Sequence, residues 1–584
     1  MANFLDKFKI RTAWEGRSHT KDLSCEHVTT SSFMRLQPVY YHNFVPKEKL
    51  SVDFRAFSRM ASMPVPTFGR ANLNIRAFFV PYRVIFPAWN DFITDAVHHF
   101  HDANEIPSTV PYFTNDSLVT LYRQGGIATE ITDASVTADF VITQENQSPT
   151  RWKFTAHGRH IFKVMESLGY KCCFHQGETS RFSALPLLAY AKIYADWYYP
   201  SAYVGSPVWL NISKHFTDNV SQKELDTTQL RELLDFSFAV NYDSDYFVSA
   251  FDEPVGPNVG TASSFQILDP ASTDGALVSS YNEVDNYTAN TPYAQNPAGG
   301  LLSQYAIEAL HRLTDYMARH RLAGARSLDR YLARFGVHLS AEKLNRSVYL
   351  GSHKIPMMTG DVMSTSDTMG SDGAHIGDYA GKGFLVGDDG HFEFQSDEYG
   401  LFLICASIVP EIGYYQGIDR HVLNTTRLSF FTPEFDGMGT RAISKNEAYL
   451  SLGGSPADVR NMSEIFGYTP QYSEYKCGRD WLTGDYRILS LNQSGDTAQA
   501  WHLFRDLSSK PSPVHSQSFV SGFDDRNQFN RIFNNTADTA DHFYLHYFFG
   551  VKSTAKMLPL YDEYDFHNDE GSDRVLDVSG VKMN

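Results

Sequence analysis

Residues 50–57 (LSVDFRAF) and 73–80 (LNIRAFFV) both alternate between apolar and polar side chains, and the second run stops at Pro81. A period of two is typical of a β-strand with one buried face, and a proline cannot donate to a strand ladder. Further strand candidates lie at residues 400–409, 429–432, 486–491 and 542–551. The first and last of these are apolar enough to be buried on both faces. Strands near both ends of the chain predict one β-sandwich with enlarged loops.

Long polar stretches separate these strand candidates. Loops longer than about 12–15 residues are uncommon unless they are functional. Segments with apolar residues at helical spacing lie within and between these polar stretches, and they are predicted to be helices. The helical segments are residues 89–100, 185–197, 303–322 and 328–335. The pattern predicts a mainly β protein, a jelly-roll β-sandwich with long loop and helical insertions, which is a fold used in viral shells among others.

The domain boundaries follow from the same pattern. Residues 1–38 are polar and irregular, which indicates an extended N-terminal arm. Residues 39–584 are predicted to form the jelly-roll domain, with insertions near 104–160, 200–300 and 351–398. A chain of 584 residues is longer than the roughly 250–300 residues that one core usually supports, so such elaborations are expected.

The charge distribution gives only local signs of nucleic-acid binding. The formal net charge is −17, but residues 1–60 hold ten Lys and Arg against six Asp and Glu. Acidic groups on one face barely affect phosphates at another, because salt screens charges over roughly 10 Å at 0.1 M. The arm joins basic residues to an aromatic ring, the combination that binds single strands without sequence preference. The candidate DNA contacts are Lys7, Lys9, Arg11, Trp14, Arg17 and Lys21.

The basic residues allow two further interpretations, one for the arm and one for a second group of arginines. The arm could instead lace neighbouring subunits together. A second run of arginines at helical spacing could contact DNA, although such residues more often form a solvated face or interface ion pairs. This second run consists of Arg312, Arg319, Arg321, Arg326, Arg330 and Arg334.

Sequence motifs for catalysis are missing. The chain has no P-loop, no GxSxG and no HExxH, and its five cysteines show neither zinc spacing nor a disulfide framework. A non-enzymatic protein without a cofactor is therefore expected. The exception to the expected lack of a cofactor is a structural calcium ion, which only weak sequence signals support. Its carboxylate ligands would come from the turns at residues 371–373 (SDG) and 388–391 (DDGH). The absence of a signal peptide or a long apolar run predicts synthesis in the cytoplasm and no membrane contact.

An ordered set of short blocks resembles the major capsid protein of microviruses, especially the gokushovirus-like branch. The blocks are RSH at 17–19, FSRMA at 57–61, FFVPYR at 78–83 with Trp89 and Phe92, SALP at 183–186, DYFVS at 245–249, YLG at 349–351, YQG at 415–417, FGY at 466–468 and WHL at 501–503. They recur in the family's order across nearly the whole chain. The resemblance implies an eight-stranded jelly roll that self-assembles into a T=1 icosahedral shell around a circular single-stranded DNA phage genome.

The resemblance also implies partners and a surface feature. A chain of charge −17 is expected to share genome neutralisation with a small basic DNA-packaging protein, and a pilot protein, an assembly scaffold and a host surface receptor are further expected partners. In gokushoviruses an insertion after the DYFVS block builds a protrusion at the threefold axis. Only about residues 255–300 occupy that place here, which puts receptor attachment through it in doubt. The candidate protrusion residues are Gly256, Asn258, Asp269, Tyr281 and Tyr287.

One rival function is a carbohydrate-binding jelly-roll protein, because the same sandwich serves lectins. It predicts a monomer or small oligomer that a sugar stabilises. The ordered blocks favour a shell-forming protein, found in virions of a bacterial host.

Overall fold

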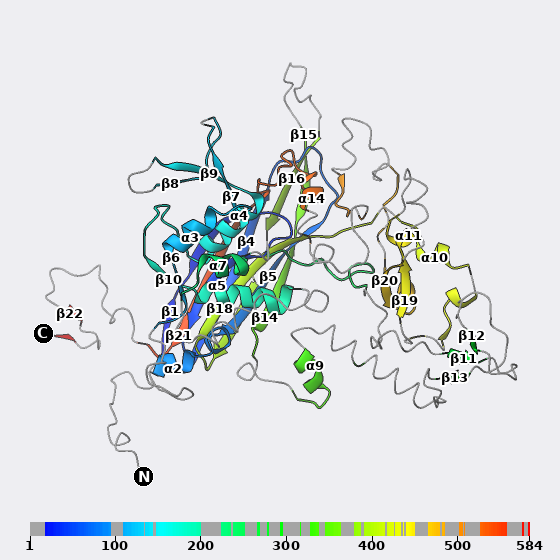
Figure 1. The fold of residues 1–584 in the computed structure, drawn as a ribbon, viewed down its shortest axis with the longest axis horizontal. Coiled ribbons are helices and arrows are strands. Elements are labelled where there is room, and N and C mark those ends of the chain that lie inside the picture. Colours follow the sequence, from blue (N-terminus) through cyan, green and yellow to red (C-terminus); the bar gives the residue numbers. More distant parts are fainter. Residues whose placement is uncertain are drawn as a thin grey trace, which may run out of the picture.

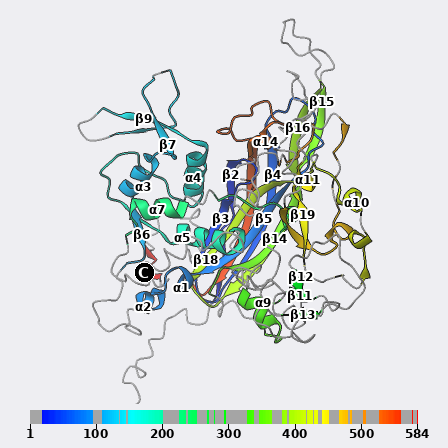
Figure 2. The same ribbon diagram turned by 45° about the vertical axis from the view of Figure 1, so that its right-hand side comes forward.

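The architecture comes from a computed structural model of the chain. It describes residues 18–94, 109–133, 135–143, 148–199, 224–234, 238–250, 327–337, 345–363, 379–386, 390–414, 417–449 and 465–507 with gaps, 522, 526–557, and a few short isolated segments. Two antiparallel sheets pack face to face as a β-sandwich (Figures 1 and 2). The predicted fold class, a mainly β jelly roll with insertions, is confirmed.

The first sheet is built around two 13-residue strands, β4 (Glu48–Met60) and β21 (Phe543–Ala555), which lie side by side although almost 500 residues separate them. On the far side of β21 lie β1 (His19–Asp22) and β2 (Cys25–Ser31) in succession. On the far side of β4 lie, in order, β17 (Gly390–Ser396), β16 (Tyr379–Val386) and, paired with β16, β15 (Met358–Met363). We call this the β21–β4 sheet.

The second sheet has the strand order β14–β5–β18–β3 and is called the β5–β18 sheet. Its strands are β14 (Val348–Pro356), β5 (Ala71–Pro81), β18 (Gly400–Pro410) and β3 (Gln37–Phe44). The chain alternates between the sheets from β2 to β5, and it crosses again from β14 to β15, from β17 to β18 and from β18 to β21. Taking β1 with β2, and β16 with β17, leaves five strands in the first sheet and four in the second, joined by the crossing connections of a jelly roll.

Aromatic side chains fill the space between the sheets. Phe394 of the β21–β4 sheet has its ring centroid 4.8 Å from that of Phe79 and 5.5 Å from that of Phe44, both on the β5–β18 sheet. Tyr40 and Phe549 meet in the same way at 5.2 Å. Aromatic pairs at these distances add to the hydrophobic gain, which fixes the two sheets against one another.

Helices from the long insertion between β5 and β14 cover the outer face of the β5–β18 sheet (Figure 1). Tyr190 on α5 donates to the carbonyl of Leu36, and Tyr194 donates to that of Ala239. This cover explains why every residue of β18 is buried, as expected for residues 400–409. The insertion elements are α1 (Tyr82–Ile85), α2 (Trp89–Thr94), β6 (Tyr112–Thr114), α3 (Asn115–Tyr122), β7 (Ala128–Ile131), β8 (Phe140–Ile142), β9 (Thr150–Phe154), α4 (Ala156–Ser167), β10 (Arg181–Ser183), α5 (Leu185–Ile193), η3 (Tyr194–Tyr198), α7 (Thr227–Leu234), β11 (Gln266–Leu268), β12 (Leu277–Val278), β13 (Tyr293–Gln295) and α9 (Ser327–Ala333).

A second group of short elements lies at the right of Figures 1 and 2, between β18 and β21 in the sequence. It centres on the antiparallel pair β19 and β20. Its elements are α10 (Arg420–Leu423), η6 (Arg427–Ser429), β19 (Thr440–Ser444), α11 (Lys445–Ala448), β20 (Ile465–Pro470) and η9 (Ser473–Tyr475). Outside this group, α14 (Arg526–Asn530) precedes β21, and β22 (Val575–Leu576) and β23 (Lys582–Met583) follow it.

The structure corrects several boundaries. The arm cannot extend to residue 38, because β1 and β2 are strands that pair with β21. The range 351–398 is not a loop insertion, because it supplies β15, β16, β17 and most of β14. Residues 429–432 form no strand: η6 ends at Ser429, whose carbonyl accepts from Arg441. Residues 486–491 and nearly all of 303–322 lie outside the described part of the chain.

Candidate assembly surfaces

The described residues hold no group of three or more His, Cys, Asp or Glu side chains that could bind a metal ion. Of the turns expected to hold calcium, residues 371–373 and 388–389 lie outside the described residues. Gly390 and His391 belong to β17 rather than to a turn, and His391 Nδ1 lies 2.6 Å from Asp53 Oδ1 on β4.

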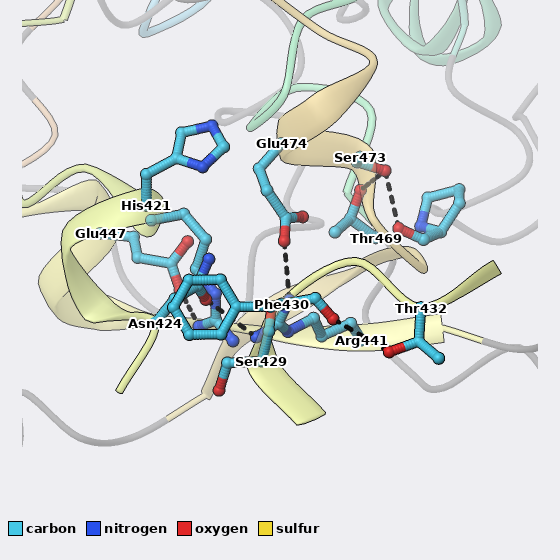
Figure 3. Close-up of polar contacts among 12 residues, drawn as sticks. His421, Asn424, Ser429, Phe430, Thr432, Arg441, Glu447, Thr469, Ser473 and Glu474 are labelled. Atoms are coloured by element: carbon cyan, nitrogen blue, oxygen red, sulfur yellow. Dashed lines mark hydrogen bonds and ion pairs between the residues drawn. The ribbon is translucent and has the colours of Figure 1, made fainter. Parts of the chain in front are cut away.

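A network of buried charges supports the corner formed by α10, η6, β19 and η9, which we call the α10 corner (Figure 3). Arg441 on β19 donates to Glu474 at 2.7 Å and also contacts Asn424 at 3.3 Å. Arg420 donates to Glu447 at 2.8 Å. Glu447 and Glu474 are almost completely buried, and each pairs with an arginine that replaces part of the hydration lost on burial. The network ties segments far apart in the sequence into one rigid base.

Exposed rings cluster near this base. Phe431 lies 5.0 Å from Tyr472 and 5.9 Å from Tyr475, while His421 lies 5.0 Å from Tyr475. Val422 is 72% exposed and Phe430 is 53% exposed. Rigidly held aromatic groups at a surface are typical of the centres of protein–protein interfaces.

The DYFVS block folds into a capped turn next to the same corner. Asp245 accepts from the backbone N–H groups of Phe247 and Val248 and from the hydroxyl of Tyr414 at 2.6 Å. Burial raises the pKa of Asp245, although these three donors act in the opposite direction. Tyr246 also reaches across to Glu447 at 3.0 Å. The block therefore has a structural role in joining the α10 corner to the sandwich.

Helix α9 stands at the lower edge of the molecule in both views (Figures 1 and 2). Its apolar side chains are turned to solvent: Leu328 is 58% exposed and Phe335, just beyond the helix, is 68% exposed. An ion pair from Asp329 to Arg346 ties it to the start of β14, and the Arg346 guanidinium lies 5.0 Å from the ring centre of Trp197. Exposed apolar side chains held together on one element are typical of a surface that contacts another molecule.

The outward face of the β21–β4 sheet is a third exposed apolar surface. Strand β21 alternates between buried and accessible residues along its length. Val28 on β2 is 73% exposed, Tyr544 on β21 is 54% exposed and Phe384 on β16 is 42% exposed. Monomeric proteins seldom leave such groups together in solvent.

A hollow of about 640 Å³ lies where this face meets the insertion. The sheet contributes Phe57 and Tyr544, and the insertion contributes Phe154 and Phe162. Lys163 on α4 is ion-paired to Asp541 at its edge. Burial lowers the pKa of this lysine, against the effect of the aspartate.

Comparison with known proteins identifies what these surfaces belong to. The family model for the phage capsid protein (F protein) matches residues 9–141 and 156–564. The chain belongs to the F protein family of capsid proteins. It is 22% identical over 521 residues to the capsid protein VP1 of Bdellovibrio phage phiMH2K, covering 83% of this chain and 84% of that protein. It is 23% identical over 553 residues to the capsid protein VP1 of Chlamydia phage 1, covering 85% of this chain and 88% of that protein.

Membership confirms the predicted resemblance and the structural role of the chain as a major capsid protein. Residues 142–155, which include β9, fall between the two matched stretches. Strand β9 therefore lies outside the matched stretches, whereas most of β8 lies within the first of them. No helix in the described part of this capsid protein is long and apolar enough to cross a membrane.

The structure places only some of the predicted site residues. Lys21 lies half-buried in β1, where its Nζ is 2.9 Å from the sulfur of Met557. Arg330 and Arg334 are exposed on and beside α9, and Arg334 lies 5.0 Å from the ring centre of Tyr316. The remaining candidates lie outside the described residues and stay predictions: Lys7, Lys9, Arg11, Trp14, Arg17, Gly256, Asn258, Asp269, Tyr281, Tyr287, Arg312, Arg319, Arg321 and Arg326.

The outward face of the β21–β4 sheet was missed by sequence reasoning. Residues 542–551 were expected to be buried on both faces, which is wrong because Tyr544 and Phe548 point outward. In the sequence, an aromatic residue that points outward cannot be told from one that points inward, because both are apolar. The charges in 48–60 were the available clue, since Arg55 and Arg59 fall on the outward side of the neighbouring strand.

Proposed function

We propose that this capsid protein forms a closed T=1 icosahedral shell around a circular single-stranded DNA genome. The observation that carries the proposal is the pair of unrelated apolar surfaces at α9 and the α10 corner, at the lower and right-hand edges of Figure 1. Contacts between different patches on identical subunits generate closed assemblies when their rotation closes. The rival function in carbohydrate binding gives no reason for several such patches.

The expected partners follow from charge. With 67 acidic and 50 basic residues, the shell needs help in neutralising a polyanion, so a small basic DNA-packaging protein is proposed. The basic residues before β1 are proposed as further DNA contacts. A pilot protein, an assembly scaffold and a host surface receptor complete the proposed partners, with synthesis in the bacterial cytoplasm.

Electron microscopy of the protein, produced together with its neighbouring genes, tests the proposal. Uniform isometric particles that protect single-stranded DNA from nuclease are the expected result. Monomers or small oligomers at all salt and protein concentrations, stabilised by a sugar, would favour the rival function.

A further inference from the structure

We propose that the outward face of the β21–β4 sheet is a platform on which bases of single-stranded DNA stack. This inference rests on the proposed function and names a site for the genome within it. The face is formed by the neighbouring strands β2, β21, β4 and β16.

The platform consists of three successive cross-strand rows in which aromatic and basic groups alternate. The first row contains Tyr544 opposite Arg59, followed by Phe384 on β16. The second contains His546 opposite Phe57. The third contains Phe548 opposite Arg55. Because side chains of alternate residues share one face, all these groups project to the same side.

The side chains within the platform already lie as a stacking surface requires. The guanidinium of Arg59 is 5.5 Å from the ring centre of Phe57, and the rings of His546 and Phe548 are 4.0 Å apart. Bases stack on aromatic rings whatever their identity, while arginine adds attraction for both the rings and the phosphates. The arrangement fits a ligand that combines flat rings with negative charge.

The local charges favour this occupant over a protein segment. Several nearby acidic groups are engaged: Glu26 contacts His546, Asp53 contacts His391, Asp541 pairs with Lys163 and Asp139 pairs with Arg159, while Glu166 lines the hollow. A basic arm or a basic protein would meet Arg55 and Arg59 across the rings. An apolar neighbour would remove the guanidinium of Arg59, which lies over the ring of Phe57, from water. A duplex cannot use the rings, since its bases are already stacked on one another.

The hollow lies at one end of the platform. Phe57, Arg59 and Tyr544 belong to both, and Phe154 and Phe162 close the far wall. Its volume of about 640 Å³ lies within the range of small-molecule sites, so an unstacked nucleotide can enter it. The pair of Lys163 and Asp541 stands at its edge.

Crosslinking in intact particles tests the site directly. Ultraviolet irradiation of DNA-containing particles, followed by digestion and mass spectrometry, is expected to attach nucleotides to peptides of β21 and β4 that contain Tyr544, Phe548 and Phe57. Particles that contain single-stranded DNA but crosslink only through other segments would overturn the inference and leave the proposed function intact. Failure of the wild-type chain to form DNA-containing particles would instead count against the proposed function.

Binding measurements give a second readout. With purified protein and a labelled oligothymidylate, Tyr544→Ala and Phe548→Ala should each weaken binding about ten-fold. Arg59→Gln should lower the slope of log affinity against log salt by about 0.7, the value for one phosphate contact to a single strand. Lys354→Gln, on the other sheet, is the matched control and should change neither quantity. Unchanged affinity together with impaired shell assembly in the two aromatic variants would show that the face packs on protein and would overturn the inference.

Discussion

Phe79 shows how strongly single side chains in the sandwich are constrained. Its ring is 1% exposed and lies between Phe44 and Phe394, so it joins the two sheets. Phe79→Asp places a charge where no partner is available, and it is expected to cost about 4 kcal/mol or more. Soluble yield and denaturant unfolding measure this. Val422→Asp, at a residue 72% exposed, is the control with an expected change within about 0.5 kcal/mol.

His542 gives the subunit a pH dependence. Its Nε2 donates to the carbonyl of Asn535 at 2.6 Å, its ring stacks on Phe533, and burial lowers its pKa. The unfolded chain therefore binds a proton more readily, so stability is complete above about pH 6.5 and decreases as the pH falls towards the folded pKa. Burial lowers the pKa values of His27 and His502 in the same way.

His542→Gln keeps a donor for Asn535 and removes the titration. The loss of stability between pH 7.5 and 5.5, measured by denaturant unfolding, should be smaller in this variant than in the wild type. An identical loss in both proteins would contradict the assignment to His542, and would leave His27 and His502 as its source.

At the scale of elements, helix α4 is positioned by one close approach. A Cβ on Gly158 would lie 1.9 Å from the carbonyl oxygen of Ile127, although alanine normally stabilises a helix relative to glycine by about 1 kcal/mol. Gly158→Ala should therefore destabilise the subunit by roughly 1–3 kcal/mol, as expected for overpacking. Thermal unfolding measures this. Gly125→Ala, where a Cβ would meet no atom within 4 Å, is the control and should not destabilise.

The strands show which elements local sequence can predict. The runs at 50–57, 73–80 and 400–409 lie within β4, β5 and β18, because their alternation or continuous apolar character reflects burial by the sheets. Residues 185–197 and 328–335 form α5 with η3, and α9, as expected. The prediction of a strand at residues 429–432 was wrong, because a short apolar run at a corner has no strand beside it to pair with.

At the scale of the whole molecule, α9 should matter to assembly and not to folding. Replacing both Leu328 and Phe335 by serine removes an exposed apolar surface, so the unfolding temperature of the subunit should change little. The yield of closed particles should fall several-fold, because interface centres supply most of the binding energy. Particle counts by electron microscopy, beside unfolding of the isolated subunit, separate the two effects. Wild-type particle yield in the double variant would exclude α9 from the shell contacts.

The sequence by itself determined the fold class, the central strands and, through an ordered set of blocks, the capsid family. These follow from local alternation and from the order of the blocks along the chain. Only the tertiary structure decided that residues 19–31 join the sandwich, because their partner β21 is more than 500 positions away. It also decided that Tyr544 and Phe548 face outward. An aromatic residue on a strand is apolar on either side, and its exposure depends on whether another part of the fold covers it.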